Sequence, residues 1–139
     1  METISFFIDQ PMVDPPELKI TEKYHLLVNI DANVKIYLGN ELAFSKVLNF
    51  IELACALKEW NQSDQNGNFT FSSMDFEEEG IIQFTRTNSG YIFSSSFSQN
   101  TPKVKVTREE VSKFSNEFFK RAKQSTKENL GIDFEKYGL

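Results

Sequence analysis

Apolar and polar residues alternate in several short stretches of the chain, with the period of two that is typical of β-strands with one buried face. Residues 91–97 show this most clearly, because Tyr91, Phe93 and Phe97 fall on one face and serines on the other. Residues 24–30 follow a similar pattern. The alternation predicts strands at residues 3–9, 24–30, 34–38, 41–44, 68–73, 81–86, 91–97 and 103–106.

Two longer stretches repeat apolar residues every three or four positions, as an amphipathic helix does. The first covers residues 45–60, where Ser45 is placed to cap the helix. The second covers residues 107–129, and the sequence Thr-Arg-Glu-Glu that starts at Thr107 matches a capping box. Gly131 follows the second stretch and is a suitable helix terminator.

The order strands, helix, strands, helix lacks the regular strand–helix alternation of parallel α/β folds. It predicts one α+β domain over residues 1–139, with a single antiparallel sheet of about six to eight strands and two helices packed on one face. A chain of this length can bury one hydrophobic core. The chain has 14 phenylalanines, and those expected on the core face of the sheet are Phe69, Phe71, Phe84, Phe93 and Phe97.

Charge is unevenly distributed along the chain. Residues 1–79 carry 14 acidic and 5 basic side chains, a net −9, whereas residues 80–139 carry 6 acidic and 10 basic ones, a net +4. The overall net charge of −5 argues against non-specific binding to nucleic acid or to anionic membranes. It is compatible with a basic protein partner.

The beginning of the sequence has neither a cationic segment nor an apolar run of signal-peptide length. No apolar stretch reaches the length of a transmembrane helix. The single cysteine, Cys55, rules out an internal disulfide, so the sequence predicts a cytoplasmic protein.

The most acidic segment links the strands predicted at residues 68–73 and 81–86. It contains Asp75, Glu77, Glu78 and Glu79 within five positions. These carboxylates could form a solvated turn that keeps strand edges soluble, or a surface for a basic partner, or a site for a hard cation such as Mg²⁺ or Ca²⁺. Acid–base catalysis would need a further group across a cleft.

The remaining candidates for chemistry have simple structural explanations. The segment from Asp64 to Asp75 resembles a calcium loop at its start, but Phe69 stands where the loop requires glycine. His25 has no nucleophile motif nearby, which favours a surface or sheet-edge role. Cys55 lies in mid-helix without a cationic neighbour, which favours a buried or half-buried structural thiol. The sequence therefore predicts no catalytic residue, metal site or cofactor.

The middle and end of the chain follow a recognisable order: a Gly-Asn hairpin, a helix ending in tryptophan, the strand end F-x-F-x-S-x-D-F-E-E, the hairpin I-x-F…G-Y-x-F-x-S and a closing amphipathic helix. The Gly-Asn turn lies at residues 39–40, and the first helix ends at residue 60. The strand end covers residues 69–78, the second hairpin covers residues 82–95, and the closing helix ends at residues 130–133. This order, over residues 24–134, resembles the small bacterial immunity proteins that are encoded beside contact-dependent or polymorphic toxins. The resemblance implies a small, cytoplasmic, non-enzymatic protein that binds and blocks one cognate toxin domain, frequently a nuclease.

The toxin-contacting residues of such proteins vary, so the resemblance assigns none here. The acidic segment supplies the candidates instead, and the predicted partner-binding residues are Asp64, Asp75, Glu77, Glu78 and Glu79. Two alternatives remain open. The same carboxylates could belong to a metal-binding protein or a small metal-dependent enzyme, or the chain could be a structural or ligand-binding module with its ligand between sheet and helix.

Overall fold

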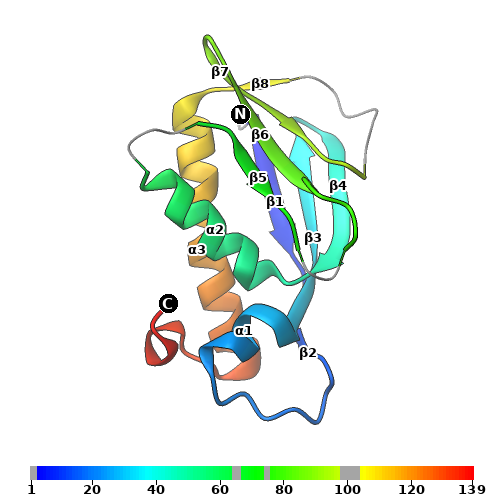
Figure 1. Ribbon diagram of the computed structural model, residues 1–139, viewed down its shortest axis with the longest axis vertical. Helices are drawn as coiled ribbons and strands as arrows, with labels where there is room; N and C mark the ends of the chain where they lie inside the picture. The colour runs from blue at the N-terminus through cyan, green and yellow to red at the C-terminus, as the bar shows by residue number, and fades with distance from the viewer. Residues whose placement is uncertain (1–2, 64–66, 74–75, 98–103) are drawn as a thin grey trace.

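Over the residues that the structure describes, the chain folds into two antiparallel four-stranded sheets and three α-helices (Figure 1). The computed structural model describes residues 3–63, 67–73, 76–97 and 104–139. The elements in chain order are β1 (Ile4–Ile8), β2 (Met12–Val13), α1 (Lys23–Asn29), β3 (Ile30–Leu38), β4 (Glu41–Leu48), α2 (Phe50–Asn61), β5 (Phe69–Phe71), β6 (Ile82–Thr87), β7 (Gly90–Ser94), β8 (Lys105–Val106), α3 (Arg108–Leu130) and the 3₁₀-helix η1 (Phe134–Tyr137).

The first sheet is built around β3. Both β1 and β2 pair with one edge of β3, and β4 pairs with the other edge. Burial alternates strictly along β3, from Ile30 to Leu38, so one face of this sheet lies in the core and the other faces outward. The β3–β4 hairpin turns at Gly39, whose φ of 60° is in the left-handed region, and this confirms the hairpin predicted at residues 39–40.

The second sheet is a meander in which β5, β6, β7 and β8 are neighbours in sequence order. Cross-strand pairs place Phe69 beside Phe84, and Phe84 beside Phe93, on the buried face. Such aromatic pairs stabilise a sheet through direct contact between opposite side chains. The prediction that these three phenylalanines face the core is therefore confirmed.

Both sheets and the helices share one hydrophobic core. Figure 1 shows the second sheet in front of the first, with α2 and α3 along one side. Phe114 of α3 joins the two sheets, because its ring centroid lies 5.5 Å from that of Phe6 in β1 and 5.8 Å from that of Phe84 in β6. The chain is thus one packed α+β unit over its described residues.

The predicted single sheet with two helices is wrong in its counts, although the α+β class and the antiparallel pairing are confirmed. The eight strands divide into two sheets of four on either side of α2 in the sequence. Period-two alternation shows that a strand has one buried face, but it does not show which strands are neighbours.

The strand predicted at residues 24–30 is a helix, α1, and β3 begins at Ile30. Leu26 and Ile30, both fully buried, are four residues apart, a spacing that suits a helix as well as a strand. The helix starts with a capping box. The side chain of Glu22 accepts a hydrogen bond from the backbone amide of His25, and the side chain of His25 accepts one from the backbone amide of Glu22. Short apolar runs are ambiguous between the two structures, and contacts with α2 favour the helix here.

The first predicted helix starts later than residue 45, because β4 continues to Leu48 and α2 begins at Phe50. Ser45 therefore lies in a strand opposite Lys35 and caps no helix. Asn49, which is buried, lies between the end of β4 and the start of α2. Its Nδ2 donates to Leu27 O at 3.0 Å, and its Oδ1 accepts from Ser73 Oγ at 2.8 Å.

The second predicted helix is confirmed as α3. Thr107 Oγ1 accepts a hydrogen bond from Glu110 N at 3.1 Å, and Glu110 Oε1 accepts one from Thr107 N at 3.1 Å, which completes the capping box. Gly131 ends the helix with a φ of 68°. The tail then folds back, and Phe134 is fully buried against the core.

Candidate functional site

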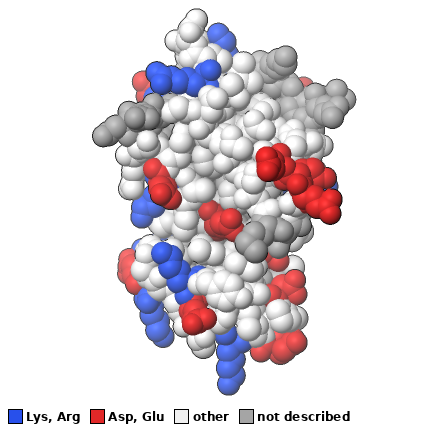
Figure 2. Space-filling model, in the orientation of Figure 1, with Lys and Arg blue, Asp and Glu red and all other residues white. Residues whose placement is uncertain are grey.

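The acidic segment lies in the connection between β5 and β6. Glu77, Glu78 and Glu79 are all exposed, and Figure 2 shows acidic side chains gathered on the side of the molecule where this connection lies in Figure 1. Of the other predicted partner-binding residues, Asp64 and Asp75 lie outside the described residues. The structure therefore brings three of the five predicted residues together.

Hydrogen bonds hold both ends of this connection. Gly80 N donates to Ser72 Oγ at 2.9 Å, and Ile81 N donates to Phe71 O at 2.9 Å. Before the glutamates, the half-buried Phe76 packs its ring against Phe97, with centroids 5.2 Å apart. Because the flanking residues are anchored to the body, the three glutamates between them are directed into solvent.

Gly80 has a specific conformational role at the end of the connection. Its φ of +67° is in the left-handed region, and a Cβ placed there would lie 2.1 Å from Gln83 Nε2. The side chain of Gln83 donates back to Gly80 O at 3.2 Å. The turn therefore favours glycine both for its backbone angle and for the space taken by Gln83.

The glutamates make an anionic surface, and the described residues supply no further group for chemistry there. Among residues 3–63, 67–73, 76–97 and 104–139, no three His, Cys, Asp or Glu side chains are grouped to hold a metal ion. None of the ion pairs between described residues involves Glu77, Glu78 or Glu79. Three exposed carboxylates that form no ion pair with another described residue are suited to electrostatic attraction of a positively charged surface.

His25 lies in α1, which corrects its predicted place at the edge of a strand. Its Nδ1 accepts hydrogen bonds from Thr21 N at 3.1 Å and from Glu22 N at 3.3 Å. A nitrogen that accepts from backbone amides at a helix start completes the cap of that helix. The structure thus assigns His25 a structural role.

Cys55 is half-buried within α2, as predicted. Burial raises the pKa of its thiol above the usual 9.0, and this outweighs the opposing effects of Lys23 and Lys58. A thiol with a raised pKa is mostly protonated near neutrality and is a weak nucleophile. This position is that of a packing residue.

The sequence patterns did not reveal an apolar outer face on the first sheet. Phe7, Met12, Leu42 and Val47 are among the most exposed large apolar side chains in the described chain, at 53%, 58%, 53% and 50%. The register places all four on the outward face of the sheet, opposite Lys35, Asp31, Tyr37 and Asn33. The sequence pattern assigned residues 45–48 to a helix. Because these residues belong to β4, Val47 points outward from the sheet.

Together these features define a small α+β protein with an anionic connection, an outward apolar sheet face and structural roles for its histidine and cysteine. Residues 4–128 match the family described as Domain of unknown function (DUF7878), and the chain therefore belongs to this family. No curated protein and no solved structure matches the chain significantly. Within its described residues, no helix has both the length and the apolar character needed to cross a membrane.

Proposed function

We propose that this protein is a non-enzymatic immunity protein that binds and neutralises a basic toxin domain. The observation that carries the proposal is the exposed row Glu77, Glu78 and Glu79 on a connection anchored at both ends. A charged surface that is already held in place loses little conformational freedom when a partner binds. The order of elements resembles that of proteins that neutralise toxins, and for this reason we propose a toxin domain as the partner.

Electrostatics support a basic partner. The three glutamates lie in the part of the chain that carries most of the negative charge, residues 1–79, with a net −9. Complementary charge raises the rate of encounter and fixes the orientation of a complex more than it raises affinity. Asp64 and Asp75, close in sequence to the same connection, belong to the proposal as further candidates.

The metal-dependent alternative has less support. A metal-dependent role needs several carboxylates that converge on one point, and the described residues contain no such group. Calorimetric titration with Mg²⁺, Mn²⁺ and Ca²⁺ separates this alternative directly, since binding heat at millimolar metal would favour it. His25 and Cys55, the other candidates for chemistry, are accounted for by capping and packing.

The test starts from the genes on either side of this one and uses, as the partner, the toxin domain that the proposal expects one of them to encode. The variant Glu77→Lys/Glu78→Lys/Glu79→Lys is compared with a control of equal charge change, Glu17→Lys/Glu41→Lys/Glu59→Lys, whose residues are also exposed. The site variant should associate about tenfold more slowly at low salt, with a flatter salt dependence, because steering is lost. The control should associate nearly as fast as the unmodified protein.

Three results would contradict the proposal. Equal slowing in both variants would mean that only net charge matters, and no slowing in either would mean that the connection is not at the interface. A neighbouring gene for a metabolic enzyme, with no toxin gene nearby, would remove the immunity role itself.

A further inference from the structure

A small pocket lies beside the acidic connection and shares a wall with it. Phe97 lines this pocket, and its ring packs against that of Phe76, the residue before Glu77, with centroids 5.2 Å apart. At the other end of the connection, Ser96 N donates a hydrogen bond to Gly80 O at 3.2 Å. Both ends of the row of three glutamates are therefore held next to the segment that contains Phe97.

The pocket has a volume of about 140 Å³ and is lined by Phe97 and by residues 42–46 of β4. Leu42 and Phe44 provide apolar surface, and the side chain of Leu42 is 53% exposed. Sites for small-molecule ligands usually have volumes of about 300–1,000 Å³. A cavity of about 150 Å³ instead holds one ring-sized apolar group. The pocket therefore has room for a single apolar side chain of a partner.

The charges around this pocket are mainly negative. The three glutamates of the connection are exposed and form no ion pair with another described residue. Glu41, also exposed, immediately precedes Leu42 at the start of β4. Among the described residues that line the pocket, Lys46 is the only cation. This excess of acids favours a partner surface that is positively charged.

Lys46 gives the pocket and the connection different preferences. Its Nζ lies 5.0 Å from the centre of the Phe97 ring, a distance at which an ammonium group is attracted to the ring face. A lysine or arginine side chain that enters the pocket meets this like charge, whereas an uncharged apolar side chain does not. The pocket thus suits an apolar side chain, and the glutamates suit the cationic side chains beside it.

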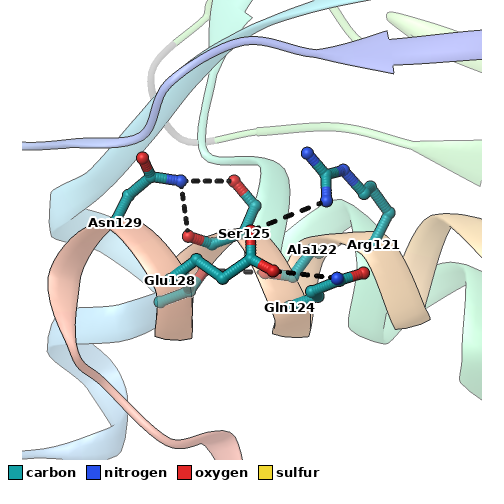
Figure 3. A network of polar contacts seen from close by, with 7 residues as sticks. Arg121, Ala122, Gln124, Ser125, Glu128 and Asn129 are labelled. Atoms are coloured by element: carbon teal, nitrogen blue, oxygen red, sulfur yellow. Dashed lines mark hydrogen bonds and ion pairs between the residues drawn. The ribbon is translucent and has the colours of Figure 1, made fainter.

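The larger groove of the molecule, about 670 Å³ between β1 and α3, has no comparable excess of charge. Its wall on α3 carries two acids and three cations. One of these cations is already compensated, because Arg121 Nη1 lies 4.0 Å from Glu128 Oε2, while Glu128 Oε1 accepts a hydrogen bond from Gln124 Nε2 at 2.9 Å (Figure 3). The smaller pocket is therefore the one whose described surroundings select a partner by charge.

We propose that the pocket between Leu42 and Phe97 holds one apolar side chain of a basic partner segment, whose neighbouring lysine and arginine side chains contact the three glutamates. This assignment rests on the proposed function, since it concerns the same basic partner. In protein complexes a few buried anchors supply most of the affinity, whereas exposed charges mainly set the association rate. The pocket therefore controls how slowly the complex dissociates, and the glutamates control how fast it forms.

The first test uses two peptides with blocked ends, Lys-Arg-Leu-Arg-Lys and Lys-Arg-Ser-Arg-Lys, and needs no toxin. The peptides carry the same charge and differ only in the central side chain. In NMR titrations of the full-length protein, both should shift the amide signals of Glu77–Glu79. The leucine peptide alone should also shift those of Leu42, Lys46 and Phe97, and it should bind about fivefold more tightly because its central side chain fills the pocket.

The matched variants for this test are Leu42→Glu and Val47→Glu. Both residues lie on β4 with similar exposure, 53% and 50%, but only Leu42 lines the pocket. Each variant adds one negative charge, so the preference for leucine over serine is compared at equal charge. Leu42→Glu should abolish the preference, and Val47→Glu should retain it.

The second test measures the kinetics of the same variants with the toxin domain that the proposed function expects. An added carboxylate does not weaken attraction to a basic partner, so faster dissociation of Leu42→Glu reports on the pocket itself. We expect its dissociation to be about tenfold faster, with no loss in association rate. Val47→Glu should dissociate like the unmodified protein, and both variants should unfold at the same denaturant concentration as the unmodified protein because the substituted residues are exposed.

Equal binding of the two peptides to the unmodified protein would overturn the pocket assignment, and so would equal dissociation rates of Leu42→Glu and Val47→Glu. These failures are distinct from failure of the proposed function. Slow association after charge reversal of the three glutamates, together with unchanged kinetics in Leu42→Glu, would remove only the pocket. A peptide preference that depends on Leu42, in a protein that binds no toxin, would confirm the pocket and remove the immunity role.

Discussion

Phe84 has the densest set of aromatic contacts among the described residues of the second sheet. Its ring centroid lies 5.6 Å from that of Phe93, 6.1 Å from that of Trp60 and 5.8 Å from that of Phe114. Because the side chain is fully buried, Phe84→Ala removes these contacts and leaves a cavity. We expect the free energy of unfolding to fall by about 3–5 kcal/mol, measured by chemical denaturation.

The matched comparison is Phe97→Ala. Phe97 was predicted to share the core face, but the structure places it only half-buried, over Phe76 and Phe44. Phe97→Ala should lower the free energy of unfolding clearly less than Phe84→Ala does. Equal losses of stability in the two variants would mean that the degree of burial does not determine how much each phenylalanine contributes to stability.

At the scale of elements, the capping box of α3 also ties the helix to Thr3, the residue immediately before β1. Glu110 Oε2 accepts a hydrogen bond from Thr3 N at 3.2 Å, and Oε1 accepts one from Thr107 N. Hydrogen bonds from Thr3, and next from Thr107, lower the pKa of Glu110 below its ordinary value of 4.5. The ionised carboxylate is therefore favoured in the folded protein over the unfolded chain.

A lowered folded pKa gives a defined pH dependence. The stabilisation by Glu110 is fully present above pH 4.5 and is lost as the pH falls through the lower pKa of the folded state. The unmodified protein should therefore be more stable than Glu110→Gln at pH 7, and the difference should shrink as the pH is lowered toward 3. Denaturant titrations of both proteins at several pH values measure this difference.

The control for this prediction is Glu109→Gln in the same helical turn. Glu109 is exposed, so its replacement should change stability little at any pH. A difference between Glu110→Gln and the unmodified protein that stays constant with pH would contradict the assigned role of the carboxylate.

At the scale of the whole molecule, two sheets share one core through α2 and α3. Trp60, the single tryptophan, contacts Phe69 and Tyr91 of the second sheet at centroid distances of 5.4 Å. Its fluorescence thus reports on the packing of α2 against that sheet. Far-UV circular dichroism reports mainly on the helices, and hydrogen exchange in β3 reports on the first sheet.

We expect all three signals to change in one transition with the same midpoint, because Phe114 packs against both sheets. Loss of the tryptophan signal before exchange opens in β3 would instead show that the second sheet unfolds as a separate unit. The measurement is a denaturant titration followed by each signal under the same conditions.

The sequence by itself determined the features that depend on local chemistry. The α+β class, the antiparallel pairing, the hairpin at Gly39 and the capping box at Thr107 all follow from turn, cap and alternation signals within a few residues. The acidic connection could also be placed between its two strands, since a run of glutamates before a glycine cannot continue a buried strand.

Tertiary structure decided the features that depend on contacts between distant residues. Residues 24–30 suit a strand or a helix equally, and packing against α2 selects the helix. Because Ala32 pairs with Leu48, β4 extends to Leu48 and α2 begins only at Phe50. The division into two sheets, the outward face with Phe7 and Val47, and the groove between β1 and α3 arise only when strands far apart in sequence come together, and alternation alone does not specify which strands are neighbours.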